Sequence, residues 1–287
     1  MYIIISDRLE MMLSFSSNAF KKFSLDIAIK EIAKIGYKGV EILCDIPHAY
    51  PPEFSKDQAK KIRNLISDLN IGISNLNAFT LFAIGDVYHP SWIENDNKLR
   101  EIRVKHTIDC IYLAKNLGAK NLSTEPGGPI NIKKNKIEST ILLKIFADGL
   151  KKVKSIAEEN DVKILVEPEP SLLIENSQQF LQLMKTICSD YIKLNFDIGH
   201  FYCVKEDPSK TILKLIDYIE HFHLSDIANN RVHYHLIPGI GSIDFEQVFD
   251  TIKKIGYKGF VTVELYPYQD NPIYVAKQAY NYLKVFI

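Results

Sequence analysis

The chain has 287 residues, of which 46% are hydrophobic, enough for one large core and short for two domains of ordinary size. Lysine plus arginine and aspartate plus glutamate both number 35, so the chain lacks the overall basic excess that drives binding to a phosphate backbone. We therefore expect one domain over residues 1–287 and no nucleic-acid partner.

The start of the chain and its cysteines suggest where the protein works. The opening MYIIISD has only a short apolar stretch, too short for a signal peptide or a membrane span. Residues 1–10 come before the first strand-like run and are expected to form an N-terminal extension. The four cysteines include no CxxC pair, which is typical of reduced thiols. These features predict a cytoplasmic protein without membrane association.

Short runs rich in β-branched and aromatic residues recur along the chain and predict strands. They cover residues 13–17, 39–43, 71–76, 120–124, 163–167, 191–197, 221–225 and 260–265. Helical apolar spacing appears between them, at 25–35, 58–69, 99–117, 142–159 and 245–255. Eight strands that alternate with helices predict an α/β fold with a single (β/α)8 TIM barrel, whose usual size is about 250 residues.

One local repeat supports this prediction. IAKIGYKGVEIL at 32–43 and IKKIGYKGFVTVEL at 252–265 share a helix end, a glycine, a short turn and a strand. Gly36 and Gly256 are expected at the helix C-termini, where a positive φ is common. The two segments therefore predict the same helix-to-strand turn used twice.

Chargeable residues stand where the last four predicted strands end. Glu167, Asp197, His223 and Glu264 follow short apolar runs, and in a barrel the carboxyl ends of consecutive strands converge on one side of the mouth. A buried, unpaired charged group is costly, whereas one divalent cation would satisfy several such groups together. The alternative for each residue alone is a strand-end side chain that caps a loop or pairs with a lysine. The four together favour a metal site.

Further polar residues near the same strand ends are candidates for substrate contacts. They are His200, three residues after Asp197; Arg231 and His235 in the segment after the seventh strand; Glu169, two residues beyond Glu167; and Asn75 at the third strand. For Asn75 the alternative is a turn-forming role. His221, on the same predicted strand as His223, is expected to face the helical layer and to be structural.

Several catalytic signatures are missing from the sequence. There is no GxGxxG after a strand, no P-loop, no HExxH and no GxSxG. Dehydrogenases, nucleotide hydrolases, zinc proteases and serine hydrolases of the usual kinds are therefore disfavoured.

The sequence resembles the xylose isomerase-like TIM barrel superfamily over nearly its whole length. The most specific motifs are LVE at 165–167, FDIGH at 196–200, HFHLSD at 221–226, PGIGSIDF at 238–245 and VEL at 263–265. The resemblance implies that Glu167, Asp197, His223 and Glu264 are metal ligands and that His200 lies near the substrate. It also implies that Glu167 and Glu264 exchange a proton with the carbon beside a carbonyl. The expected cofactor is one divalent cation, Mn²⁺ first, with Mg²⁺, Co²⁺ or Zn²⁺ as alternatives.

Three activities within the superfamily remain open on the sequence. The first is an isomerase or epimerase that works on a small sugar, keto-polyol or cyclitol through an enediolate. The second is a dehydratase of the inosose or dehydroshikimate type, which begins with the same proton abstraction. The third, a zinc-dependent apurinic endonuclease, is disfavoured because its zinc cluster needs histidines after strands two and three or nearby, and here those places read ILCDIPH and NLNAF, which offer only His48. A barrel that only binds a ligand is a further alternative, and a homodimer is plausible for this superfamily.

Overall fold

The computed structural model describes residues 11–130 and 136–287, so the expected N-terminal extension lies outside the described part. Eight parallel strands form one closed barrel in chain order, with the last strand paired to the first. They are β1 (Met12–Ser16), β2 (Gly39–Leu43), β3 (Gly72–Asn77), β4 (Asn121–Thr124), β5 (Lys163–Val166), β6 (Ile192–Asp197), β7 (Ile219–Leu224) and β8 (Phe260–Val263). The predicted (β/α)8 TIM barrel is confirmed.

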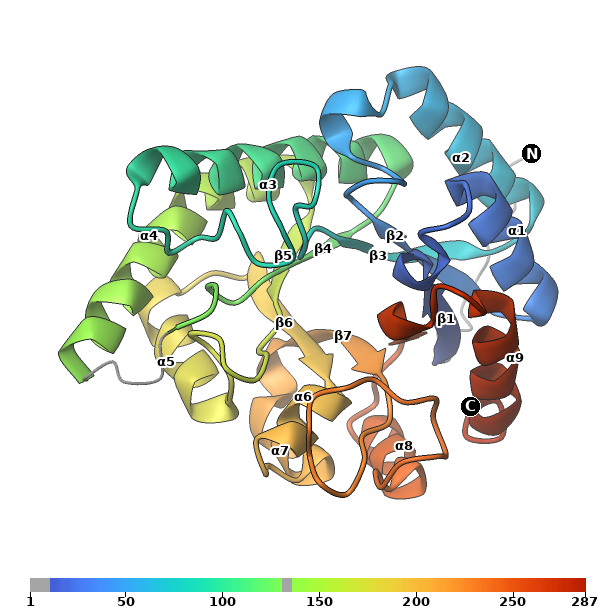
Figure 1. The fold of residues 1–287 in the computed structure, drawn as a ribbon. Coiled ribbons are helices and arrows are strands. Elements are labelled where there is room, and N and C mark those ends of the chain that lie inside the picture. The colour runs from blue at the N-terminus through green and yellow to red at the C-terminus, as the bar shows by residue number, and fades with distance from the viewer. Residues whose placement is uncertain (1–10, 131–135) are drawn as a thin grey trace.

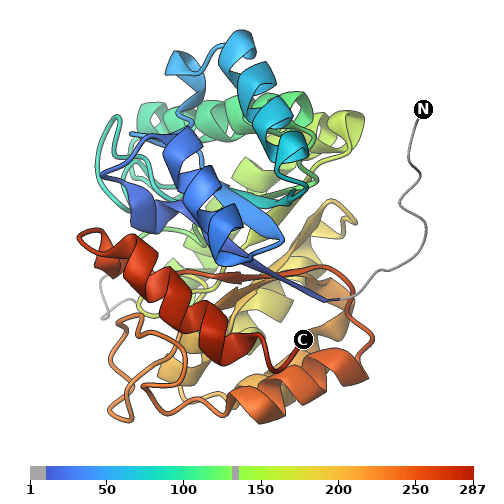
Figure 2. The ribbon, with the colours of Figure 1, turned by 90° about the vertical axis from the view of Figure 1, so that its right-hand side faces the viewer.

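Helices surround the strands on all sides (Figure 1). They are α1 (Leu25–Ile35), α2 (Lys56–Asp68), α3 (Asn97–Leu117), α4 (Lys136–Asn160), α5 (Ser177–Ile187), α6 (Ile198–Cys203), α7 (Pro208–Leu215), α8 (Phe245–Lys254) and α9 (Pro272–Leu283). The last helix, α9, packs beside the first, α1, which completes the ring (Figure 2). Within the described ranges, no helix is both long and apolar enough to cross a membrane.

The strands are buried on both of their faces, as a barrel inside a ring of helices requires. In β2, all five residues of GVEIL are buried. Val40 and Ile42 belong to the apolar core, whereas Glu41 between them contacts Asn75 and His223 of other strands inside the barrel. Side chains two apart in a strand share a face. Glu41, Asn75 and His223 therefore make this part of the barrel interior polar.

The repeated turn is present at both predicted places. Gly36 ends α1 with φ of 122°, and Gly256 follows α8 with φ of 69°. Their surroundings differ, because a Cβ on Gly36 would lie 2.6 Å from the Tyr280 hydroxyl, whereas a Cβ on Gly256 would meet nothing within 4 Å. The two glycines share the backbone requirement, and only Gly36 is also confined by a neighbouring side chain.

Replacing each glycine by alanine should therefore separate the two effects. We expect Gly256→Ala to lower the free energy of unfolding by about 1 kcal/mol, the cost of a left-handed alanine. Gly36→Ala should cost more, about 2 kcal/mol or above, because the methyl group also collides with Tyr280. Urea unfolding followed by circular dichroism measures both values, and equal losses would contradict the role given to Tyr280.

Candidate active site

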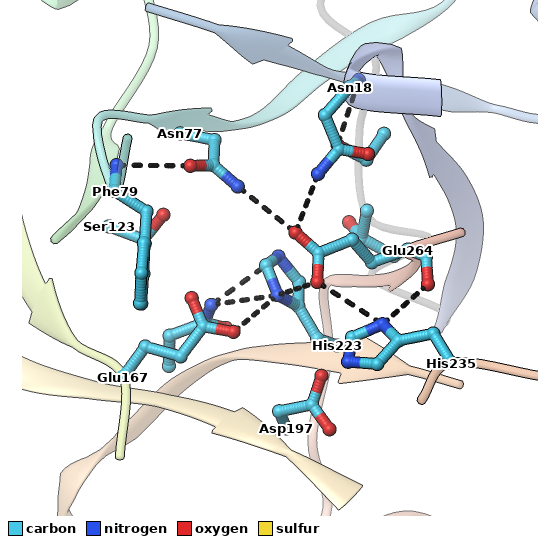
Figure 3. Close-up of polar contacts among 12 residues, drawn as sticks. Asn18, Asn77, Phe79, Ser123, Glu167, Asp197, His223, His235 and Glu264 are labelled. Carbon is cyan, nitrogen blue, oxygen red and sulfur yellow. Dashed lines mark hydrogen bonds and ion pairs between the residues drawn. The ribbon is translucent and has the colours of Figure 1, made fainter. Parts of the chain in front are cut away.

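The four predicted metal ligands meet at the carboxyl end of the barrel. Glu167 follows β5 directly, Asp197 ends β6, His223 lies near the end of β7, and Glu264 follows β8. Asp197 and His223 are paired neighbours on adjacent strands. One ligand atom from each of the four lies within 4.8 Å of the others, and all four side chains are buried. Figure 3 shows the three carboxylates arranged around the His223 ring. The predicted convergence is confirmed, and the role as ligands stays a prediction.

The carboxylate atoms of this group fit a divalent cation. Among the described residues, Glu167 Oε2 and Asp197 Oδ2 are buried without a hydrogen-bond partner. The other oxygen of Asp197 accepts from the His200 amide at 2.9 Å, because Asp197 also begins α6. Burial raises the pKa of Asp197 and of Glu264 above the ordinary carboxyl value. Three carboxylates and one imidazole form a donor set suited to Mn²⁺, Zn²⁺ and similar ions.

His223 lies between acidic groups on both of its ring nitrogens. Nδ1 is 2.8 Å from Glu167 Oε1 and 3.6 Å from Glu264 Oε2, and Nε2 is 2.7 Å from Glu41 Oε2. Burial alone would lower the pKa of His223, but the carboxylates of Glu167, Glu41 and Glu264 together raise it well above the usual value. These neighbours therefore favour the charged form of the His223 ring.

Two side-chain amides hold Glu264, a contact that the sequence did not predict. Asn18 Nδ2 donates to Glu264 Oε1 at 2.8 Å, and Asn77 Nδ2 donates to the same oxygen at 3.2 Å (Figure 3). Asn18 lies in the short 3-10 helix η1 (Ser17–Phe20) after β1, and Asn77 ends β3. These bonds fix one oxygen of Glu264, and Oε2 is left to face His223.

A cavity of about 330 Å³ opens next to this group. Glu167 and Glu264 both line it, together with Asn18, Lys21, Asn77, Glu169, His200, His233 and the aromatic residues Phe79, Phe82, Tyr88 and Tyr266. The ammonium of Lys21 lies 4.9 Å from the centre of the Phe82 ring, and burial lowers its pKa. A cavity lined by aromatic rings together with a few polar side chains is typical of a small-molecule binding site.

Glu169 lies at the cavity, as predicted. The residue is 5% exposed, and its carboxyl accepts a hydrogen bond from the Tyr88 hydroxyl at 2.8 Å. Burial raises the pKa of Glu169 to about 8, although the Tyr88 hydrogen bond opposes the shift. The Glu169 carboxyl therefore holds a proton more readily than an exposed glutamate does.

The predicted residues His200 and His235 form a cluster with His233. His200 donates Nδ1–H to the Pro168 carbonyl and His235 donates Nδ1–H to the Glu264 carbonyl, both at 2.9 Å. Their Nε2 atoms face each other at 3.3 Å, and His233 Nε2 is 3.2 Å from that of His235. Burial lowers the pKa of His200 to about 4 and of His233 to about 3. These neutral histidines are a second group that could hold a metal ion.

The segment that carries His233 and His235 is tied to the barrel by Asp226, from the motif HFHLSD. Asp226 Oδ2 accepts from the amides of Gly239 and Gly241 at 2.9 and 2.8 Å. A Cβ at Gly241 would lie 2.3 Å from Asp226 Oδ1, so this close approach requires glycine. The glycines in PGIGSIDF therefore let the backbone fold over the carboxylate of Asp226, which holds the segment in place.

The structure does not place Asn75 or Arg231 at the cavity. Asn75 lies inside β3, where its amide donates to Glu41 Oε2 at 2.7 Å and to Ser123 Oγ at 3.0 Å. Arg231 has a φ of 60°, and its guanidinium lies 4.1 Å from the centre of the Tyr202 ring and donates to the Tyr202 carbonyl. Both side chains are therefore engaged elsewhere than at the cavity lining.

The expected orientation of His221 is wrong. Residues two apart on a strand point to the same side, so His221 faces the barrel interior like His223. Its Nε2 is 2.8 Å from Thr262 Oγ1 and 3.8 Å from Glu41 Oε2. The structural role predicted for it is compatible with this position.

Comparisons with known proteins agree with this architecture. Residues 29–285 match the family model described as xylose isomerase-like TIM barrel. Inosose dehydratase of Clostridium perfringens is 27% identical over 159 residues, which are 49% of this chain and 54% of that protein, so this match spans about half of the relative's length. The structure of a D-tagatose 3-epimerase-like protein aligns with a TM-score of 0.80 at 24% identity, covering 96% of this chain and 97% of the other. The structure of an IolI protein with a bound zinc atom aligns with a TM-score of 0.77 at 21% identity, covering 96% and 99%.

The likeness to these solved structures concerns the fold, and the family match covers most of the chain. The chain belongs to the xylose isomerase-like TIM barrel family.

Proposed function

We propose that the protein is a divalent-metal-dependent isomerase or epimerase that moves a proton beside the carbonyl of a small sugar, keto-polyol or cyclitol. The observation that carries this proposal is the pairing of Glu167 and Glu264, which line one cavity and belong to one candidate ligand group. Proton abstraction beside a carbonyl requires a base, an acid and stabilisation of the developing oxyanion.

The two glutamates are suited to exchange a proton with substrate. Glu264 is held by Asn18 and Asn77, so its position is fixed before substrate binds. Its Oε2 faces His223 beside the cavity, and a carboxylate in this position could accept a proton from a bound substrate. Glu167 reaches the same cavity from β5 and would act as its counterpart. One glutamate would remove the proton, and the other would return it.

A divalent cation held by Glu167, Asp197, His223 and Glu264 would supply Lewis-acid stabilisation of negative charge on the substrate oxygens. We propose Mn²⁺ as the native ion. The zinc atom in the IolI structure makes Zn²⁺ the first alternative to test.

A dehydratase of a keto-cyclitol is the second candidate, and Glu169 favours it. Loss of water needs an acid that protonates the departing hydroxyl group, and Glu169 has a pKa of about 8 at the cavity wall. The relative from Clostridium perfringens is named inosose dehydratase. Both candidates begin with the same proton abstraction, and they differ in whether a hydroxyl group then leaves.

The endonuclease alternative receives no support from His48. This histidine is turned toward Ser17 Oγ at 3.2 Å and the Phe20 carbonyl at 3.3 Å, and it is not part of the cavity lining. We therefore do not propose a trinuclear zinc nuclease.

Product analysis tests the proposal and separates its two forms. Protein reconstituted with Mn²⁺ or Zn²⁺ would be incubated with a panel of ketoses and inososes, and the products would be followed by NMR. A new epimer or isomer supports the first candidate, and an elimination product that absorbs in the ultraviolet supports the second. Chelated protein serves as the control. Cleavage of abasic duplex DNA without turnover of any ketone would contradict both.

A further inference from the structure

Glu41 is a buried carboxylate in the middle of a strand and has no part in the proton transfer proposed above. Its side chain is 0% exposed and points into the barrel below the candidate metal ligands. Asn75 donates to Oε2 at 2.7 Å, and Asn77 donates to Oε1 at 3.2 Å. A buried charged group is costly unless it is paired, so a carboxylate at this position requires a nearby group that binds it.

That partner is the Nε2 atom of His223, 2.7 Å from Glu41 Oε2. The other nearby histidine, His221, lies further away, with its Nε2 3.8 Å from Glu41 Oε2. The carboxylate of Glu41 therefore pairs with His223 rather than with His221.

The two ring nitrogens of His223 therefore have different roles. A carboxylate accepts hydrogen bonds, so Nε2 must keep its proton while Glu41 is ionised. Nδ1, which faces Glu167 and Glu264, is then the nitrogen that can release its proton and offer a lone pair. Histidines that bind metals commonly donate the other ring N–H to a carboxylate, which fixes the tautomer and the ring plane.

Asn77 connects this arrangement to Glu264. Its Nδ2 donates both to Glu41 Oε1 and to Glu264 Oε1, each at 3.2 Å. Asn75 and Asn77 thus set the orientation of the Glu41 carboxylate, and that carboxylate in turn sets the ring of His223. The same amide of Asn77 also holds Glu264, so the positions of Glu41 and Glu264 are linked.

We propose that Glu41 is the positioning residue of the metal centre: it holds the Nε2 proton of His223 and so presents Nδ1 to the cation. This proposal rests on the proposed function, because it assumes that His223 is a ligand. A residue that only filled space in the core would leave the metal affinity and the environment of the ion unchanged.

The test compares Co²⁺ and Zn²⁺ binding to the wild-type protein and to Glu41→Gln, which keeps the size of the side chain and removes its charge. We expect an affinity about 10–100-fold lower in the variant. The visible absorption of bound Co²⁺ should change as well. In wild-type protein, the paramagnetically shifted N–H proton of the His223 ring should be visible by NMR, and its chemical shift should change in the variant.

A matched control is Glu125→Gln, because Glu125 is also 0% exposed but accepts from the amides of Trp92 and Gly127. It should bind Co²⁺ as the wild type does. If Glu41→Gln does not fold, Glu41→Asp is the second variant, because it keeps the charge but shortens the side chain by one methylene. Its metal affinity should also fall below that of the wild type, by a smaller factor. Wild-type affinity and an unchanged Co²⁺ spectrum in the folded Glu41 variant would overturn the proposal. A wild-type protein that binds neither ion would instead contradict the metal centre itself.

Discussion

Glu264→Gln is expected to reduce turnover by about 10²–10⁴-fold, the range typical for removal of a general acid or base. The change removes both the negative charge that would bind the cation and the group that would accept the proton. The amide oxygen of glutamine can still accept from Asn18 and Asn77, so the loop after β8 should keep its conformation. Metal affinity should fall together with turnover, while the thermal unfolding of the metal-free variant should stay close to that of the wild type.

The measurement is steady-state turnover with the best ketone substrate, combined with metal titration of the same preparation. Glu246→Gln is the control, because Glu246 is an exposed glutamate in the first turn of α8. This control should retain full activity and affinity. A fully active Glu264→Gln protein would remove the assignment of Glu264 to the site.

Removal of the metal is expected to abolish turnover and to lower the melting temperature. An ion that binds only the folded chain stabilises it by about 2.7 kcal/mol when present at 100 times its dissociation constant. Dialysis against a chelator, followed by return of Mn²⁺ or Zn²⁺, should remove and then restore both properties. Differential scanning calorimetry with and without the ion measures the change.

Metal affinity should also rise with pH. The pKa values of Asp197 and Glu264 are raised by burial, and that of His223 is raised by its neighbouring carboxylates. All of these groups must be deprotonated at the ligand atom to bind a cation, so protons compete at higher pH than for ordinary carboxyl groups. Dissociation constants measured across pH 5 to 8 should therefore fall as the pH rises, and a constant value would contradict the ligand assignment.

Much of the barrel could be predicted from local sequence patterns. The β2 run GVEIL was placed at its observed bounds, and Gly36 and Gly256 were recognised as positive-φ residues. Helix α4 covers Lys136–Asn160, beyond the predicted 142–159. Boundaries of this kind depend on packing against neighbouring helices, which local periodicity does not contain.

The part of the candidate site that lies at the ends of strands could be predicted from the sequence. Glu167, Asp197, His223 and Glu264 stand where strands end, and the topology brings them together. Glu41 was missed because it lies inside an apolar run, although a single carboxylate in GVEIL is itself an anomaly in a buried strand. Asn18 was missed because η1 is too short to leave a periodic pattern. Whether Asn75 and Arg231 reach the cavity depends on tertiary packing, which the local sequence does not contain. A homodimer and a cytoplasmic location stay predictions.

The most direct test of the central claim is exchange of a carbon-bound substrate proton in D₂O. Wild-type protein loaded with Mn²⁺ or Zn²⁺ should incorporate deuterium at the carbon beside the carbonyl of an accepted ketose or inosose, and chelated protein should not. Deuterium incorporation that depends on the metal and is lost in Glu264→Gln is the result that proton transfer by these glutamates predicts. Turnover of such a substrate without any incorporation from solvent, or exchange that survives both chelation and the substitution, would contradict it.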